Sequence, residues 1–325
     1  MQPINAEVLQ GIAKTTFYGA IKDEESKRIY PKICEIIDQP DLTVTYTSFG
    51  GVPEPRQLSG SRAATGNRQA KSLADYTLVG TVVEWEDTVT IPRAVIETNP
   101  QEIPRITAQM AQKASLFLDR RLVGTSLPST TALGYDGIAL FSGSHAETGS
   151  NQDNDNSTAV TGIVGTTTHP TTSEFEAMID LALSDIKAFT DDVGTPVNAG
   201  VTNYTIVCPL EFEFHLKSVL GVLGGNYQMA GGIAPADDIY TGRFRGMFDV
   251  VGSPFVATND RVYIFCNDGG TKAMALLKNK DWEFKSNIGT DSDLWNYEQT
   301  ALFTAYARFE FVPWNWKVAY RHVYT

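Results

Sequence analysis

Several stretches of the chain alternate between apolar and polar residues, which is the pattern of β-strands with one buried face. Residues 42–49 (LTVTYTSF) form the first stretch, and residues 76–92 (YTLVGTVVEWEDTVTIP) form the second, which predicts one or two strands. Near the C-terminus, residues 301–312 and 316–324 predict two more strands, both rich in aromatic residues. We expect these last two strands to form a sheet that packs on a helix.

Residues 50–75 separate the first two stretches and contain almost no large apolar side chain. A polar segment of this kind cannot bury enough surface to form a core. With a predicted strand on either side, it predicts a protruding β-hairpin with a long tip. Four side chains make this tip basic, namely Arg56, Arg62, Arg68 and Lys71.

Apolar residues recur at helical spacing over residues 99–124, the strongest helix pattern in the chain. Asn99 is expected to cap this helix, Pro100 suits its first position, and Gly124 is expected to end it. At ~1.5 Å per residue the helix would be well over 30 Å long. It is therefore predicted to be a long structural spine.

The remaining segments complete a prediction of the α+β class. Residues 1–45 carry a mixed helical signal, and the apolar stretch that begins at Ile29 is broken by Pro31 and Pro40. Such a weakly cored segment is expected to be an extended arm lying on a neighbour. Residues 125–170 are mostly polar loop. A compact α/β unit follows, with predicted helices at 173–189 and 209–220 and strands at 204–208, 250–256 and 262–265.

The net charge and the hydropathy of the chain argue against some classes of function. The net charge of −12 disfavours a general nucleic-acid-binding surface, which needs clustered Lys and Arg. No apolar run reaches the roughly 18 residues of a membrane span, and the N-terminal residues do not follow a signal-peptide pattern. We therefore expect the protein to fold in the cytoplasm. The basic tip lacks aromatic residues for base stacking, so an acidic protein surface, such as another copy of this chain, is its expected partner.

Cys208 is the strongest candidate for catalysis, because it precedes a predicted helix N-terminus, where a thiol pKa falls. His215 lies two helical turns away, roughly 10 Å, which is too far for a hydrogen-bonded pair. A buried, unreactive thiol is the preferred interpretation. Cys34 and Cys266 share no metal or disulfide spacing with it.

The other candidate sites fail on spacing. The loop residue His145 could act as a base or metal ligand, but a local hydrogen bond is the preferred interpretation. Asp153 and Asp155 begin like a calcium loop, yet Thr158 and Val164 stand where that loop requires Gly and Glu. We predict no catalytic residue, no metal site and no cofactor.

Three motifs resemble those of a known family. RQLSGSR (56–62) is followed by the strand WEDTVTIPRAVIE (85–97), the long helix ends in DRRLVG (119–124), and YDGIALFSGSH (135–145) follows it. Together with the order of elements, they resemble tailed-phage major capsid proteins with the HK97-like fold, and most closely the Mu-like major head subunits.

This resemblance implies a domain for each segment. Residues 1–45 would be the N-terminal arm, 46–80 the E-loop, and 81–170 the first part of the P-domain with the spine helix 99–124. Residues 171–290 would be the A-domain, and 291–325 the returning P-domain strands.

The resemblance also implies partners and a location. Copies of the chain would form hexamers and pentamers of an icosahedral shell, assembled in the cytoplasm of a bacterial host. Scaffolding, portal and decoration proteins would be further partners, and packaged double-stranded DNA would be enclosed without sequence-specific contact. The alternatives left open are another phage structural protein, such as a tube or decoration protein, and a thiol hydrolase that uses Cys208.

Overall fold

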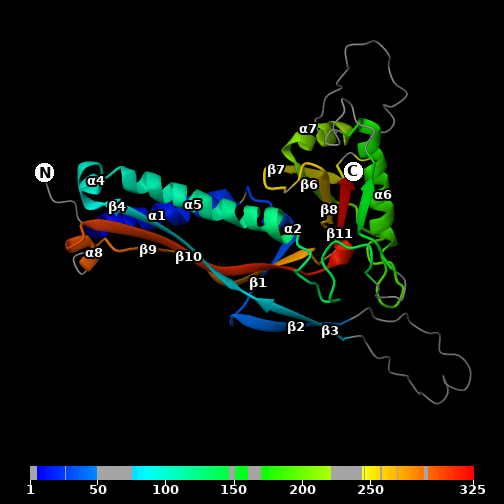
Figure 1. Ribbon diagram of the computed structural model, residues 1–325, viewed down its shortest axis with the longest axis horizontal. Helices are drawn as coiled ribbons and strands as arrows, with labels where there is room; N and C mark the ends of the chain where they lie inside the picture. The colour runs from blue at the N-terminus through cyan, green and yellow to red at the C-terminus, as the bar shows by residue number, and fades with distance from the viewer. Residues whose placement is uncertain are drawn as a thin grey trace, which may run out of the picture. The chain divides into compact units, whose positions relative to one another are not determined.

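The computed structural model describes two compact units within the chain (Figure 1). The described residues are 6–25, 27–49, 75–145, 151–159, 170–220, 244, 246–256, 258–268, 270–288 and 292–325. The first unit comprises Met1–Val44, Gly80–Pro128 and Met274–Val312, and the second comprises Thr45–Val79, Ser129–Ala273 and Pro313–Thr325. Among the described residues, no helix has the length and apolar character that crossing a membrane requires.

The first unit is a four-stranded sheet in the order β1-β9-β10-β4. Strand β1 runs parallel to β9, and β10 pairs antiparallel with β4 from Thr300 opposite Pro92 to Phe309 opposite Val83. Helices α1 and α5 cover one face of this sheet (Figure 1). Its elements are α1 (Ala6–Glu25), α2 (Tyr30–Ile33), β1 (Cys34–Asp38), β4 (Val83–Pro92), α4 (Arg93–Thr98), α5 (Glu102–Arg121), a π-helical turn (Leu122–Ser126), β9 (Met274–Ser286), α8 (Asp293–Asn296) and β10 (Thr300–Pro313).

The second unit is built on a five-stranded sheet in the order β5-β11-β8-β6-β7. Strand β8 runs antiparallel to both neighbours, whereas β5 and β7 pair in parallel at the two edges. A separate two-stranded sheet joins β2 and β3. The elements are β2 (Thr43–Phe49), β3 (Asp75–Thr81), β5 (Asp155–Thr158), α6 (Thr172–Ala188), β6 (Tyr204–Pro209), α7 (Leu210–Val219), β7 (Phe248–Ser253), β8 (Arg261–Cys266), a 3-10 turn (Trp316–Val318) and β11 (Ala319–Tyr324).

The N-terminal residues differ from the expected extended arm. They form the 20-residue helix α1, which buries Leu9, Ala13 and Phe17 in the core of its own unit. The Phe17 ring stacks on Phe284 of β9 with centroids 5.0 Å apart. The expectation of an extended arm was wrong because Leu9, Ala13 and Phe17 recur at helical spacing and pack into the core of this unit, while Val8 and Ile12 stay exposed.

The long helix is present, but its start differs from the prediction. Asn99 ends α4, and α5 begins at Glu102 after Gln101, which makes no side-chain capping bond. The Asn99 amide instead donates to the Glu102 carboxylate at 3.3 Å. At the other end, Gly124 lies inside the π-helical turn that continues the helix to Ser126.

The two C-terminal strands do not share a sheet. Strand β10 buries alternate residues against α5 and α1, as the prediction requires. Strand β11 instead lies between β5 and β8 in the second unit. The prediction of one sheet was therefore right for β10 and wrong for β11, because alternation predicts a strand without identifying its partner. Residues 129–170 and 313–325 belong to the second compact unit, and residues 274–290 belong to the first.

Candidate functional site

The residues predicted to contact a neighbouring subunit, Arg56, Arg62, Arg68 and Lys71, lie outside the described residues. The strands that lead to and from them, β2 and β3, form the predicted hairpin sheet. The hydroxyl oxygens of Thr43 and Thr81 lie 3.3 Å apart across the two strands.

Cys208 cannot act as a nucleophile in this structure. Its side chain is fully buried near the C-terminal end of β6, whereas His215 is exposed on α7, so the two do not form a pair. Burial, assisted by the negative charge of Glu213, raises the pKa of the Cys208 thiol to about 12. The preferred interpretation of an inert buried thiol is confirmed, and Cys34 and Cys266 are buried free thiols as well.

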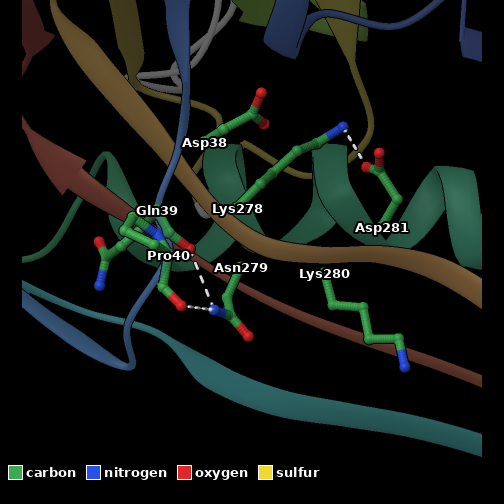
Figure 2. A pocket seen from close by; sticks show the side chains of 7 residues that line it. All are labelled: Asp38, Gln39, Pro40, Lys278, Asn279, Lys280 and Asp281. Carbon is green, nitrogen blue, oxygen red and sulfur yellow. Dashed lines mark hydrogen bonds and ion pairs between the residues drawn. The ribbon is translucent and has the colours of Figure 1, made fainter.

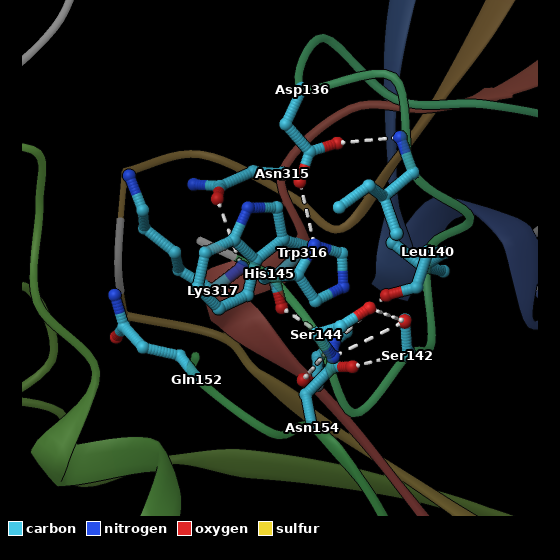
Figure 3. A network of polar contacts seen from close by, with 12 residues as sticks. Asp136, Leu140, Ser142, Ser144, His145, Gln152, Asn154, Asn315, Trp316 and Lys317 are labelled. Carbon is cyan, nitrogen blue, oxygen red and sulfur yellow. Dashed lines mark hydrogen bonds and ion pairs between the residues drawn. The ribbon is translucent and has the colours of Figure 1, made fainter. Parts of the chain in front are cut away.

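His145 makes the local hydrogen bond that its loop position predicts (Figure 3). Its Nδ1–H donates to the Asp136 carboxylate at 2.6 Å, and the ring is completely buried. The imidazole also stacks on the Trp316 indole, with centroids 4.2 Å apart and an interplanar angle of 7°. Among the described residues Nε2 has no hydrogen-bond partner. Through its stacking on Trp316, His145 joins its loop to the turn before β11.

Asn154 is the centre of the same polar network, and sequence analysis missed it. Its buried amide nitrogen donates to the carbonyl oxygens of Leu140 (2.8 Å), Trp316 (3.2 Å) and Ala319 (3.2 Å). Its side-chain oxygen accepts from the Ser142 backbone N–H at 2.9 Å. These contacts hold the loop after Leu140 against the start of β11 (Figure 3).

The acidic residues beside Asn154 are held by hydrogen bonds within the protein. Asp155 accepts from the Arg321 guanidinium, with Nε to Oδ1 at 2.6 Å. Asp153 accepts the Asp155 backbone N–H at 2.8 Å. In the described part of the chain, no three potential ligands gather in a way that could hold a metal ion.

A hollow of about 310 Å³ opens in the first unit at the end of β1, beside the middle of β9 (Figure 2). The Asn279 amide donates to the carbonyl oxygens of Gln39 (3.0 Å) and Pro40 (2.9 Å) in its wall. Lys278 and Asp281 form an ion pair at 2.6 Å. Ligand pockets are mostly apolar and enclosed, and this open hollow lined by paired charges does not have that character.

Comparison with known proteins identifies the family of this chain. Residues 75–321, three quarters of the chain, match the family described as phage capsid protein. The chain belongs to this family. Its members are structural proteins rather than enzymes. No curated protein sequence matches the chain.

Solved capsid structures share the fold of this capsid chain at low sequence identity. The cyanophage P-SCSP1u capsid matches with a TM-score of 0.58 at 10% identity, over 91% of this chain and 88% of that one. Mycobacterium phage Bobi matches with a TM-score of 0.56 at 13% identity, over 90% and 89%. The bacteriophage JBD30 capsid gives 0.51 at 12% identity and covers 90% of this chain, which spans only 63% of the JBD30 chain. The α+β fold of the HK97-like type expected from the sequence is confirmed.

Proposed function

We propose that this capsid chain is the major subunit of the icosahedral head of a tailed double-stranded DNA phage. The match of residues 75–321 to the capsid family carries the proposal, and the similarity of fold over 91% of the chain supports it. Copies of the chain would form the hexamers and pentamers of the shell, within the cytoplasm of a bacterial host. A tube or decoration protein is the weaker alternative, because the fold matches capsid shells along nearly the whole chain.

The finer assignments rest on sequence motifs and remain part of this proposal. The Mu-like major head subunits are the subfamily whose motifs the chain resembles, and scaffolding, portal and decoration proteins are its proposed partners. Within the subunit, α5 corresponds to the spine helix, and β2 and β3 with the segment between them correspond to the E-loop. The net charge of −12 suits a shell that encloses DNA without binding its sequence.

Electron microscopy of the purified protein, with its mass measured by light scattering, tests the proposal. Closed shells, tubes or separate capsomers are the expected products. A monomer or compact small oligomer under all assembly conditions, including co-expression with the neighbouring phage structural proteins, would contradict it.

The predicted contact residues can be tested in the same assay. Arg56→Glu combined with Arg68→Glu is expected to reduce particle yield while the isolated subunit stays folded. A Glu54→Gln variant is the matched control, because Glu54 lies in the same segment and has the opposite charge. Particles at wild-type yield from the double variant would remove these residues from the interface.

A further inference from the structure

Helix α5 has one buried face and one exposed face with a distinct charge. The buried face packs into the core of the first unit through Ile103, Met110 and Ala111. The exposed residues follow the helical repeat along the other side and form what we call the α5 stripe: Arg105, Gln109, Gln112, Lys113, Leu116 and Arg120. At ~1.5 Å per residue, the stripe is about 22 Å long from Arg105 to Arg120.

The α5 stripe carries positive charge and no negative charge. Its cations are Arg105, Lys113 and Arg120, and its other members are neutral. Arg105 pairs with Glu102 at the start of the helix. The remaining ion pair of α5 within the described residues involves Arg121, so Lys113 and Arg120 stay unpaired. Two cations of the stripe are therefore available to an anionic partner.

The surfaces next to the α5 stripe balance their charges. On the other face of the sheet, Arg308 pairs with Glu84 at 2.6 Å and Lys285 with Glu283 at 3.6 Å. Arg308, Glu84 and Lys285 each follow or precede an aromatic residue that packs against α5 or α1, so they point away from the helices. The exposed ions of α1, beside α5, include both signs equally: Glu7, Lys14, Lys22 and Asp23. The stripe thus differs from both neighbouring surfaces.

The net charge of −12 does not prevent attraction of an anion at this stripe. At physiological ionic strength the Debye length is about 8 Å, so exposed acids farther away than this are largely screened. The acids of α5 itself are already occupied. Glu102 pairs with Arg105, and the buried Asp119 accepts the backbone N–H of Ile29 at 3.0 Å.

The composition of the stripe favours DNA over a protein as its partner. Protein interfaces have an apolar, aromatic-rich centre, whereas Leu116, 38% exposed, is the only apolar member of the stripe. Arg, Lys and Gln side chains all donate hydrogen bonds to phosphate oxygens. At ~3.4 Å per base pair, the length of the stripe corresponds to about six base pairs of a duplex.

We infer that the α5 stripe contacts the phosphate backbone of the double-stranded DNA enclosed by the shell. The inference rests on the proposed function, and it adds the surface of the subunit that faces the DNA. Contacts to phosphate carry no base sequence information. Each copy contributes few charges, so each contact is weak and sensitive to salt, and the number of copies in a shell makes the sum large.

The salt dependence of DNA binding tests this inference on the unassembled subunit. Anisotropy of a fluorescent duplex of about 20 base pairs gives the binding constant between roughly 10 and 100 mM KCl, where phosphate contacts are strongest. Each phosphate contact contributes about 0.9 to the slope of log K against log salt. We expect Lys113→Gln with Arg120→Gln to weaken binding at least about tenfold at the lowest salt and to make the slope shallower by about 2.

Lys187→Gln with Lys285→Gln is the matched control, because it removes the same charge from exposed positions elsewhere. Lys187 lies in the last turn of α6, and Lys285 lies on the other face of the sheet. This variant is expected to keep the wild-type slope and to bind within about twofold of wild type. Both double variants should keep the wild-type unfolding midpoint in urea. Equal slopes for the two variants, or a wild type that does not bind the duplex, would overturn the inference.

A photo-cross-link in DNA-filled heads distinguishes DNA from a protein partner. We expect p-benzoylphenylalanine in place of Lys113 to cross-link to DNA on irradiation, and the same amino acid in place of Lys285 to give at least about tenfold less cross-linked DNA. Cross-links from position 113 to protein alone would assign the stripe to an acidic protein surface and overturn the inference. A wild-type chain that forms no particles would instead refute the proposed function, whereas the binding measurement on the unassembled subunit does not depend on assembly.

Discussion

Asp119 offers a direct test of how the first unit is held together. Its carboxylate lies near the end of α5 and is 4% exposed. Oδ1 accepts the backbone N–H groups of Ile29 at 3.0 Å and Tyr30 at 3.1 Å, at the start of α2. Arg28 is adjacent in sequence, and its Nε donates to Ser115 at 2.8 Å. The segment between α1 and β1 is thus tied to α5 through this carboxylate and through the Arg28–Ser115 hydrogen bond.

The cost of removing this carboxylate follows from the two buried donors it satisfies. A buried N–H without a partner costs about 1–3 kcal/mol, so Asp119→Ala is expected to lower the free energy of unfolding by about 3 kcal/mol. Asp119→Asn keeps one oxygen that both donors can reach, but it removes the charge and the second oxygen, which also accepts from Ile29 at 3.2 Å. Hydrogen bonds to charged groups are roughly twice as strong as neutral ones, which predicts a loss of about 1 kcal/mol for Asn.

Urea unfolding of the unassembled subunit, followed by tryptophan fluorescence, measures these differences. Hydrogen exchange adds a local measurement, because the Ile29 and Tyr30 amides should lose protection before the rest of the unit. Glu35→Ala, an exposed acid on β1, is the matched control and should change stability by less than about 0.5 kcal/mol. The reasoning fails if the Ala and Asn variants are equally unstable, or if Asp119→Ala unfolds at the wild-type urea concentration.

Three further predictions concern the second unit. Burial lowers the pKa of His322 from 6.5 to about 4. Between these pH values the unfolded chain binds a proton that the folded chain does not. The free energy of unfolding should therefore fall by roughly 3 kcal/mol as the pH drops from 6.5 to 4. In urea titrations at each pH, His322→Phe should abolish this part of the dependence, and an unchanged slope would contradict the assignment. Asn154→Ala should cost about 3 kcal/mol in the same measurement, since it leaves several buried groups without partners, and a loss below about 1 kcal/mol would show that the network is dispensable. The Cys208→Ala variant should assemble normally. In the wild-type subunit no native thiol should react with a maleimide until the subunit unfolds. Rapid labelling of the folded wild type would disprove the burial of these thiols.

Sequence patterns predicted local structure well where one residue type repeats at a fixed period. The alternation along β10 and the helical spacing of α5 both correspond to observed elements, because each has one buried face over ten or more residues. The helix α6 begins at Thr172, close to the predicted start, and its capping box joins Thr171 and Glu174. Such signals are local and therefore visible in a single sequence.

Long-range partners could not be predicted in the same way. Nothing in the residues of β11 distinguishes a place beside β8 from one beside β10, since both are apolar strands. Asn154 lies in a run of polar residues that resembles a solvated loop, and only the fold shows that its amide is fully buried. Cys208 lies on β6 and not on the helix, so the helical spacing used to reject it did not apply, and its burial is what excludes it. The prediction for the basic tip stays a prediction.

The placement of the last two strands has a consequence for synthesis of the protein. Strand β10 is an inner strand of the four-stranded sheet, and β11 is an inner strand of the five-stranded sheet. Both strands lie within residues 300–324, so neither sheet can be completed until the ribosome has translated this segment. A chain released before it would lack the middle of both sheets and could not take a subunit's place in a shell. Because the last strands to be translated complete both sheets, truncated chains are expected not to fold and so not to enter an assembly in which each subunit contacts several others.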